Sequence, residues 1–421
     1  MLKIFYNFLI ILFYIPYIFL IFFRRLIKKE HQTKYKEKVF INNFKRPEGF
    51  LFWFHVASIG EFKSILPIID FYLKQNIKNN FLITTVTLSS FNELEKKYGS
   101  NNRIIHQFLP YDFKFLVNNF FKNWRPDIAS FVDSEIWPNF ILKIKEENIP
   151  LILLNARITK KSFLRWKMVK TLSNKIFGSF SLCISSSKDT SDYLNILGAK
   201  NIKFFGNIKF CSAVENKTKE TEQFKSITNK KTWCAVSTHA NEEDLCGKVH
   251  GIIKKSAGDV LTIIIPRHIH RVETIYSNLR DLGFRVQVKK EKDPINSSSD
   301  VVLVNYYGAV SKYLKYFKLI FIGKSMLKKF ENSGGQNPID AAKMGCHIYH
   351  GPYVYNFREI YQFLDESKLS EEVRSPEVLA DKLIKNFDID LKTDNEKIKK
   401  LDIYSNKIFN DVINEYNTFI K

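Results

Sequence analysis

The chain has 421 residues, more than the roughly 250–300 at which a single hydrophobic core stops growing, so we expect two domains of similar size and an appendage. Hydrophobic residues make up 45% of the chain and aromatic residues 15%. This apolar content is enough to fill two cores, so the protein does not belong to the disordered class. The 65 Lys and Arg against 43 Asp and Glu give a net charge of +22, which indicates an anionic partner (nucleic acid, acidic lipid or a phosphorylated substrate) unless it reflects a general compositional bias.

Residues 2–23 form an apolar N-terminal segment, LKIFYNFLIILFYIPYIFLIFF, about as long as the ~20 residues that cross a bilayer. The basic segment RRLIKKE follows directly, and positive charge on this side predicts that the rest of the chain is cytoplasmic. We therefore expect residues 1–28 to be a membrane anchor, with acidic lipid headgroups near the basic segment. Because Pro16 interrupts the apolar run, the anchor either spans the bilayer or lies in its interface.

After the anchor, short apolar runs rich in Ile, Val and Phe alternate with amphipathic segments. Continuous apolarity predicts strands that are covered on both faces, as in parallel sheets built from βαβ units. A first series of strands is expected at residues 50–57, 81–87, 103–110, 127–133, 150–156, 181–187 and 202–207. A second series is expected at residues 232–238, 259–266, 284–288, 300–305, 318–323 and 346–351.

Each series is a candidate Rossmann-like lobe, so the fold class is α/β. A polar, charged stretch at residues 211–231 separates the two series. We expect an N-terminal lobe at 29–210 and a C-terminal lobe at 211–421, and the last helices either stay with the second lobe or pack back on the first. Ligands of such sheets bind beyond the carboxyl ends of the strands, which predicts a cleft between the lobes.

Six polar clusters follow predicted strands. In the first lobe they are HVASIGE (55–61), DSEIWPN (133–139) and LLNARITKKSF (153–163). In the second lobe they are VSTHANEED (236–244), IIPRHIHR (264–271) and GGQNPIDAAKMG (334–345). Six clusters at strand ends predict a single site.

In this order, after an apolar N-terminus, the six clusters resemble the 3-deoxy-D-manno-octulosonic acid (Kdo) transferases of bacterial lipopolysaccharide assembly. The similarity runs through nearly the whole chain. It implies a GT-B glycosyltransferase with two Rossmann-like lobes facing a central cleft, CMP-Kdo as donor and a lipid A precursor (lipid IVA) as acceptor. It also implies a place at the cell inner membrane, with the lobes on the cytoplasmic face and anionic membrane lipids as partners.

Glu61 follows Gly60 at the predicted start of a helix, where the helix dipole helps to keep its carboxylate ionised. Such a carboxylate can take a proton from an attacking acceptor hydroxyl, which is general-base catalysis. A glutamate that only favours the helix dipole is the other interpretation. The resemblance favours the base, because the family's catalytic base lies in an S-x-G-E motif, here Ser58 to Glu61, and displacement with one base inverts the anomeric centre.

The donor carries a phosphodiester and a carboxylate, so its site needs fixed cationic and N–H donors. Arg267 can bind a phosphate through two N–H groups. Asn337 and Pro338 predict the N-cap and first residue of a helix whose N-terminus binds anions, with plain helix capping as the alternative. Asp340 can accept from a ribose hydroxyl. The resemblance implies nucleotide contacts at Pro266, Arg267, Tyr307, Gly308, Ala309, Asn337, Pro338, Ile339 and Asp340.

Three features depart from the family pattern. The sequence Tyr307-Gly308-Ala309 stands where relatives carry Met-Gly-Glu, so position 309 offers no acidic side chain to the donor. Asp340 replaces a Glu and is one methylene shorter, and Lys324 stands where a Gly is usual. These changes affect donor affinity and loop closure rather than the reaction class.

Other polar residues of the six clusters are candidates for contacts with donor or acceptor. In the first lobe, the candidates of the second and third clusters either orient Glu61 or bind a sugar or lipid phosphate. The alternative is that Trp137 and Pro138 simply pack a turn. The candidates are Ser58, Gly60, Glu135, Asn139, Asn155, Arg157, Ser237, Thr238, His239, Glu242, Gly334, Gly335 and Gln336. His55 and His268 are expected to be mainly structural.

The sequence contains neither a metal-ligand cluster nor a D-x-D motif, so we expect no metal and no cofactor. A GT-B enzyme with a UDP- or GDP-sugar donor and another lipid acceptor is an alternative with the same fold. A membrane-tethered nucleic-acid-binding protein is disfavoured, because the chain shows neither RNP nor helix-turn-helix motifs.

Overall fold

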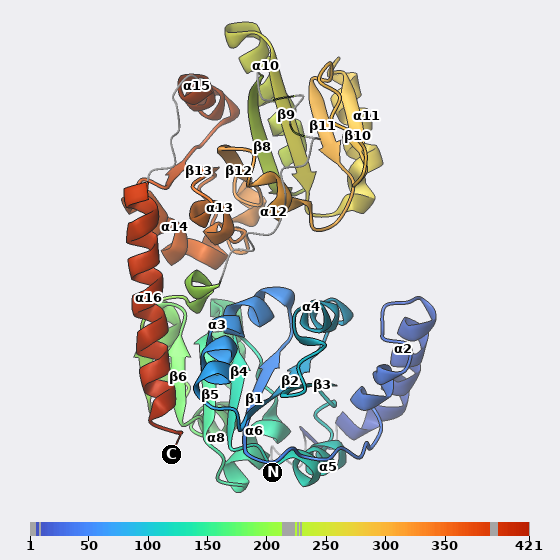
Figure 1. The fold of residues 1–421 in the computed structure, drawn as a ribbon, viewed down its shortest axis with the longest axis vertical. Helices are drawn as coiled ribbons and strands as arrows, with labels where there is room; N and C mark the ends of the chain where they lie inside the picture. Colours follow the sequence, from blue (N-terminus) through green and yellow to red (C-terminus); the bar gives the residue numbers. More distant parts are fainter. Residues whose placement is uncertain are drawn as a thin grey trace. The chain divides into compact units, whose positions relative to one another are not determined.

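The computed structural model describes residues 6–7, 10–212, 224, 227, 230–387 and 395–420. The chain divides into two compact units (Figure 1). Unit 1 comprises Met1–Ala213 with Tyr404–Lys421, and unit 2 comprises Val214–Ile403. The last 18 residues therefore belong to the N-terminal unit, so the end of the chain follows the second of the two expected arrangements, in which it packs back on the first lobe.

Unit 1 contains a parallel seven-stranded sheet of order β3-β2-β1-β4-β5-β6-β7. Its strands are β1 (Phe50–Val56), β2 (Asn79–Thr85), β3 (Ile104–Phe108), β4 (Ile128–Val132), β5 (Leu151–Ala156), β6 (Leu182–Ser185) and β7 (Ile202–Phe204). Along the chain, β2 and β3 are added on one side of β1, and β4 to β7 are then added on its other side. The strand order therefore reverses between β1 and β4, and the carboxyl ends of strands at such a switch point are where α/β sheets bind ligands.

Helices connect these strands because each apolar run is followed by an amphipathic segment. They are α3 (Ile59–Gln75), α4 (Leu88–Tyr98), α5 (Lys114–Trp124), α6 (Pro138–Glu146), α7 (Lys160–Met168), α8 (Lys170–Phe177) and α9 (Lys188–Ile196), with 3-10 turns η1 (Lys34–Lys38) and η2 (Ile208–Cys211). Trp53 of β1 lies in the core, with the rings of Phe120, Phe131 and Phe140 at 4.7–5.7 Å from its own. This packing fixes the edge of the sheet at which β1 and β4 end. We call the residues that directly follow a strand its exit.

The N-terminal helix α2 (Tyr14–Leu26) packs on unit 1 by one face only. Ile21 of this helix is buried against Tyr35 and Val39, and the Tyr14 hydroxyl donates to the Val39 carbonyl at 2.8 Å. The other face exposes large apolar side chains, namely Ile15, Phe19, Leu20, Phe22, Phe23 and Leu26. Within the described residues, no helix has both the length and the apolarity needed to cross a membrane. Residues 1–5 and 8–9 of the expected anchor lie outside the described residues.

Unit 2 contains a second parallel seven-stranded sheet, of order β10-β11-β9-β8-β12-β13-β14. Its strands are β8 (Lys231–Thr238), β9 (Val260–Pro266), β10 (Val286–Lys289), β11 (Val301–Val304), β12 (Leu319–Ile322), β13 (His347–His350) and β14 (Ser370–Glu372). The strands before β12 lie on one side of β8 and those from β12 onward on the other. The switch point of this sheet therefore lies between β8 and β12.

The helices of unit 2 are shorter around the β11 and β12 exits than elsewhere. They are α10 (Glu242–Ala257), α11 (Val272–Asp281), α12 (Ala309–Tyr313), α13 (Ile339–Lys343), α14 (Arg358–Glu366) and α15 (Pro376–Phe387), with 3-10 turns η4 (Ile269–Arg271), η5 (Lys328–Phe330) and η6 (Tyr355–Phe357). The last helix, α16 (Asn395–Asn417), begins in unit 2 and ends in unit 1.

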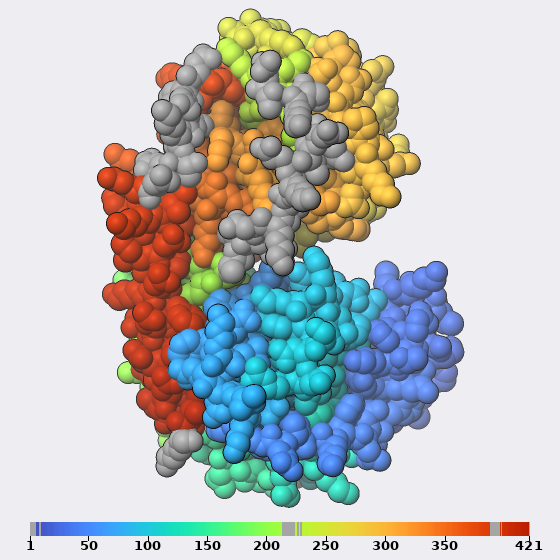
Figure 2. All heavy atoms as spheres, in the orientation of Figure 1, coloured from blue at the N-terminus to red at the C-terminus, as the bar shows by residue number. Residues whose placement is uncertain are grey.

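The C-terminal half of α16 packs along α3 of unit 1 (Figure 2). Tyr416 is fully buried and hydrogen-bonded to Ser130 of β4 at 2.7 Å. The Tyr72 hydroxyl donates to Asn417 at 2.8 Å. The end of the chain thus completes the core of unit 1.

Candidate active site

Glu61 lies in the first turn of α3, directly beyond β1. Ser58 is the N-cap: its hydroxyl accepts the Glu61 N–H at 3.3 Å and donates to the Glu61 carboxylate at 2.7 Å. The second carboxylate oxygen accepts the Ala57 N–H at 2.7 Å. These reciprocal bonds form a capping box, so Glu61 does have a role at the helix start.

The electrostatic surroundings of Glu61 are unusual for a capping residue. Burial raises the pKa of its carboxyl, and hydrogen bonds from Ala57 and Ser58 oppose this, while the charges of Asp133 and Glu135 raise the pKa further. A helix N-terminus alone would lower the pKa of an acid. Acids with raised pKa values beyond the strands of a sheet are characteristic of functional sites, because proton transfer needs a group that changes charge near the working pH.

Asp133 comes directly after β4, the neighbour of β1 in the sheet. Its side chain is only 6% exposed and forms an ion pair with Lys209 of η2, with 2.9 Å between Nζ and Oδ2. Asp133 belongs to the cluster DSEIWPN, but neither it nor Lys209 is among the site residues predicted from the sequence. Since the two residues are 76 positions apart, no local spacing could have indicated the pair.

Glu135 is held beside Glu61 by a small polar network. Its Oε2 lies 3.2 Å from His55 Nε2 and accepts from Trp137 Nε1 at 2.8 Å. Burial raises the pKa of Glu135, but these hydrogen bonds outweigh it and lower the pKa overall. His55 is buried and its Nδ1 contacts Thr84, so its structural role is to hold Glu135 in place.

Backbone strain is found at the ends of four strands. Asp133 after β4, Asn155 in β5, Ser237 in β8 and Lys324 after β12 have φ of +62°, +53°, +56° and +59°. The left-handed region is unfavourable by about 1–2 kcal/mol for residues such as Ser237 and Lys324, and by less for Asp133 and Asn155, whose residue types adopt it more readily. Such strain is concentrated at functional sites, where the surrounding structure imposes it.

Two candidates of the first lobe are structural residues. Asn139 is 4% exposed and both of its side-chain N–H groups are used, by the carbonyl of Asp112 and by Asn7. Asn155 is 1% exposed, and its side chain accepts the Ile208 N–H at 3.0 Å. Asn155 lies near the end of β5 and Asn139 in the first turn of α6, and both side chains are used by contacts within the protein.

Arg157 and Gly60 lie where the sequence predicted. The Arg157 N–H donates to the Asp133 carbonyl at 3.0 Å, which ties the β5 exit to the β4 exit. Gly60 is exposed in the first turn of α3, and a Cβ there would meet only the Ser58 hydroxyl, at 4.0 Å. In unit 1 the structure thus brings together Ser58, Gly60, Glu61, Glu135 and Arg157.

In unit 2 the exits of β8 and β9 are in contact. The Arg267 N–H donates to the Thr238 carbonyl at 3.0 Å, and the rings of His239 and His268 are 5.4 Å apart. Burial lowers the pKa of His239 to about 4, and the charges of Lys324, His268 and Arg267 lower it as well. Positive charge therefore gathers at these exits, as a site for an anion requires.

The motif S-T-H-x-x-E suggested that Glu242 faces a ligand, but the structure shows its side chain buried in the protein. Its side chain is fully buried, and its two oxygens accept four backbone N–H groups at 2.6–3.1 Å, from His239, Lys324, Ser325 and Met326. Through these hydrogen bonds, Glu242 holds the segment after β8 and the segment after β12 together.

The two glycines before α13, Gly334 and Gly335, lie very close to another segment of the backbone. A Cβ on Gly334 would lie 2.0 Å from the Tyr353 carbonyl oxygen, and Gly335 has φ of +90° and donates its N–H to the Lys324 carbonyl. Both positions therefore require glycine. The Gln336 carbonyl accepts from the Tyr361 hydroxyl at 3.0 Å, so this segment is also fixed to α14.

The helix after the glycine pair differs from the prediction. It begins at Ile339 with Pro338 at the N-cap, one residue later than expected, and has only five residues. The Asn337 side chain still accepts the Ile339 N–H, at 3.1 Å. A helix this short has a weak dipole, so α13 alone does not make an anion site. Asp340 lies in its first turn, as expected.

The remaining donor candidates differ in exposure. Arg267, Asn337 and Tyr307 are exposed, whereas Pro266, Pro338, Ile339 and Ala309 are buried and can offer only backbone groups. Gly308 has φ of +80° and is the N-cap of α12. Ala309 is the first residue of α12 and is only 1% exposed, so its short side chain suits this buried position.

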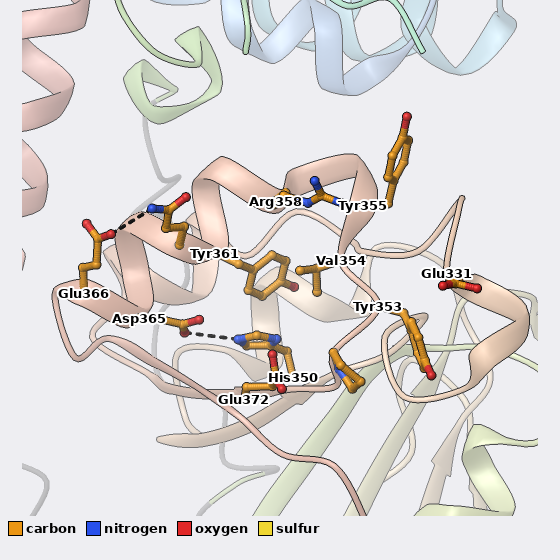
Figure 3. A pocket seen from close by; sticks show the side chains of 12 residues that line it. Glu331, His350, Tyr353, Val354, Tyr355, Arg358, Tyr361, Asp365, Glu366 and Glu372 are labelled. Carbon is orange, nitrogen blue, oxygen red and sulfur yellow. Dashed lines mark hydrogen bonds and ion pairs between the residues drawn. The ribbon is translucent and has the colours of Figure 1, made fainter. Parts of the chain in front are cut away.

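A separate pocket of about 510 Å³ lies in unit 2 beside α14 (Figure 3). Four acids and one arginine line it, namely Glu331, Asp365, Glu366, Glu372 and Arg358. His350 lies 3.1 Å from Asp365 in its wall. Because acids predominate, this pocket does not suit an anionic ligand. Among the described residues, no group of three metal-ligating side chains is found.

Comparison with known proteins identifies the family. Residues 25–212 match the family model described as 3-deoxy-D-manno-octulosonic-acid transferase (kdotransferase). The 3-deoxy-D-manno-octulosonic acid transferase of Rickettsia bellii is 31% identical over 380 residues, which cover 90% of this chain and 89% of the relative. That of Haemophilus influenzae is 24% identical and covers 78% and 76%.

A solved structure shows the same fold. The glycosyltransferase from Rickettsia africae superposes with a TM-score of 0.59 at 15% identity, over 89% of this chain and 99% of that one. The two units of this chain are thus the two parallel α/β lobes of a GT-B-like fold. Together with the identity to the Rickettsia bellii protein, this shows that the chain belongs to the 3-deoxy-D-manno-octulosonic acid transferase family of glycosyltransferases.

Proposed function

We propose that this enzyme transfers Kdo from CMP-Kdo to a lipid A precursor, with inversion at the anomeric carbon. Membership of the family supports Kdo transfer in lipopolysaccharide biosynthesis. The observation that carries the catalytic proposal is the position of Glu61 at the switch point of unit 1, where burial and two like charges raise the pKa of its carboxyl.

Glu61 acts as the general base. Its carboxylate removes the proton from an acceptor hydroxyl as the hydroxyl oxygen attacks the anomeric carbon of Kdo. The bond from that carbon to the phosphate oxygen breaks, and CMP leaves with the electron pair. A raised pKa makes the carboxylate a stronger base, provided that it is still ionised at the working pH. Asp133 and Glu135 contribute through their charge and are positioning residues.

The donor is held by unit 2. Arg267 offers a guanidinium to the phosphate, and Asn337, which is exposed before α13, offers its side-chain amide to the nucleotide. Asp340 accepts from a ribose hydroxyl. The proposal includes no metal, because the phosphate charge is met by side-chain cations and N–H groups. Turnover that collapses in EDTA would contradict this part.

The decisive experiment is product analysis with the purified full-length protein, CMP-Kdo and a tetraacylated lipid A precursor. We expect Glu61→Gln to lower kcat by about 10²–10⁴-fold, because a general base contributes that much. The amide oxygen of Gln can still accept the Ala57 N–H, so the helix start is preserved and unfolding should not account for the loss. Near-normal turnover of Glu61→Gln would remove the base from the mechanism. Tighter binding of UDP or GDP than of CMP would instead favour another sugar donor.

The proposal also places the enzyme at the cytoplasmic face of the inner membrane. The exposed apolar face of α2 is followed by Arg24, Arg25, Lys28 and Lys29, which suits an interface that contains anionic lipids. We expect the full-length protein to sediment with anionic vesicles and to bind neutral ones less well. Retention in the soluble fraction without detergent would count against this location.

A further inference from the structure

Unit 1 contains an apolar pocket of about 420 Å³ beside the β4 exit. One wall is the N-terminal segment of the chain, with Ile10, Phe13 and Tyr17, and the opposite wall includes Ile136 and Trp137. Nine of its twelve lining residues are aromatic, isoleucine or proline. The volume lies in the range of roughly 300–1,000 Å³ that is usual for ligand pockets, so it is large enough to bind an organic group.

Hydrogen bonds join the two walls and give the pocket a defined shape. The Tyr6 hydroxyl donates to Asp112 Oδ2 at 2.8 Å. Asn139 Nδ2 donates to Asn7 Oδ1 at the same distance. Asp112 also accepts the backbone N–H groups of Asn139 and Phe140, at 2.8 and 3.0 Å. The N-terminal segment is thus fixed to the start of α6, and the pocket is more than a gap beside a loosely attached helix.

The chemistry of the lining suits an uncharged apolar ligand. Among the lining residues, which all belong to the described part of the chain, the charged side chains are those of Asp112 and Glu135. Asp112 is 5% exposed, and burial raises its pKa to about 7. Both acids already accept hydrogen bonds from the protein, and negative charge in the wall disfavours a phosphate or carboxylate. A hydrocarbon chain, by contrast, gains free energy by leaving water and loses no hydrogen bond.

The pocket adjoins both the candidate active site and α2. Glu135 lines it, and the charge of Glu135 acts on Glu61, so the β4 exit is common to the pocket and to the catalytic acid. Phe13 and Tyr17 line it from the N-cap and the first turn of α2. The outer face of this helix exposes large apolar side chains, as a helix in contact with lipid does. A lipid that meets α2 therefore has the pocket next to it.

We propose that this pocket binds an acyl chain of the lipid acceptor and thereby places the acceptor headgroup beside Glu61. The inference rests on the proposed function, since it takes the acceptor to be a lipid. The occupant is the chain of the acceptor rather than that of a bulk membrane lipid, because Glu135 puts the pocket next to the acid that removes the acceptor's proton. Binding of the chain supplies acceptor affinity and holds the attacking hydroxyl in place.

The test is kinetic and uses the full-length enzyme in detergent solution, with CMP-Kdo and two acceptors. These are the tetraacylated lipid A precursor and its fully deacylated form. Ile10→Trp fills the pocket from the N-terminal wall. We expect it to lower kcat/KM for the tetraacylated acceptor about tenfold or more, because the burial of two methylene groups already corresponds to that factor. The kcat/KM for the deacylated acceptor should stay within about twofold of the wild-type value, since that acceptor has no chain to bury.

Ile15→Trp is the matched control, because it makes the same change in the same segment at a side chain that is 65% exposed and does not line the pocket. It should leave both kcat/KM values unchanged. Phe13→Asp is a second probe, which decides the question if Ile10→Trp does not fold. Phe13 is 63% exposed and is the N-cap of α2, a position that Asp favours, so this variant should fold. Its carboxylate in the pocket wall should lower kcat/KM for the tetraacylated acceptor alone.

The outcomes separate this inference from the proposed function. If Ile10→Trp and Phe13→Asp use the tetraacylated acceptor as well as the wild type does, the inference is overturned and the proposed function stands. If Ile10→Trp instead loses binding to anionic vesicles while its kcat/KM for that acceptor is unchanged, the pocket holds a membrane lipid and the inference is again overturned. A wild type that transfers Kdo to neither acceptor overturns the proposed function and this inference with it.

Discussion

Glu61 serves both the helix and the proposed reaction, and the two roles have opposite effects on its pKa. The Ala57 N–H and the Ser58 hydroxyl stabilise the ionised form, whereas burial and the charges of Asp133 and Glu135 disfavour it. The net effect is a raised pKa. The capping bonds also fix the direction of the carboxylate, which a base must keep during proton transfer.

The charge of Glu135 should be visible in the pH dependence of the reaction. Glu135→Gln removes a like charge, so the pKa of Glu61 should fall and its basic form should appear at lower pH. Because activity requires ionised Glu61, the acid limb of kcat/KM should shift to lower pH. A pH–rate profile of the purified enzyme measures this, and the position of the limb is independent of any loss in the maximal rate.

Glu146→Gln is the matched control, since Glu146 lies on α6 of the same unit and its side chain is 66% exposed. Its acid limb should coincide with that of the wild type. An unshifted limb in Glu135→Gln would mean that Glu61 does not titrate in the limb that is observed.

At the scale of elements, the two sheets use their switch points differently. In unit 1, acids gather beyond β1 and β4. In unit 2, Arg267 lies beyond β9 and Lys324 beyond β12, while the acid Glu242 is turned inward to bind backbone N–H groups. One carboxylate thus sets the shape of a loop whose surface charge is positive.

Removing an acceptor oxygen from Glu242 should make the segment after β12 less rigid. Glu242→Gln replaces one accepting oxygen by an NH2 group that meets backbone N–H donors, so we expect a loss of about 2–4 kcal/mol in the free energy of unfolding. With the proposed donor, CMP affinity should fall as well, because the segment after β12 would no longer be held against the segment after β8. Urea denaturation and calorimetry measure the two effects.

Asp244→Asn controls for the loss of one negative charge in the first turn of α10. We expect it to change the free energy of unfolding by less than about 0.5 kcal/mol. If Glu242→Gln were equally mild, the four N–H bonds would not be what holds the loop.

At the scale of the whole molecule, the sequence predicted thirteen strands, and each is confirmed within a few residues. The fourteenth, β14, has the sequence Ser-Glu-Glu at the sheet edge and lacks the apolar run that marks a buried strand. The six polar clusters do follow strands, because their position after each strand is given directly by the order of residues in the sequence. The inward direction of Glu242 and Asn139 depends on partners far along the chain, which no local pattern contains.

For a similar reason, the sequence left open which of the two units holds the end of the chain. The amphipathic pattern of α16 indicates a helix with one buried face, but it does not say which unit buries that face. In the structure Ile408, Val412 and Tyr416 are fully buried in unit 1, so unit 1 is complete only when the last residues have been made.

Tyr416 tests this dependence, because its ring is fully buried against β1 and α3 and its hydroxyl is hydrogen-bonded to Ser130. Tyr416→Ala should lower the free energy of unfolding of unit 1 by about 3–5 kcal/mol, as for other large aromatic residues in a core. Tyr416→Phe keeps the ring and should lose only about 1 kcal/mol with the hydrogen bond. Hydrogen exchange resolves the two units: the faster exchange of Tyr416→Ala should appear in β1, β4 and α3, although α16 follows unit 2 in the sequence. If the strands of unit 2 were the ones to lose protection, the C-terminal segment would stabilise that unit instead.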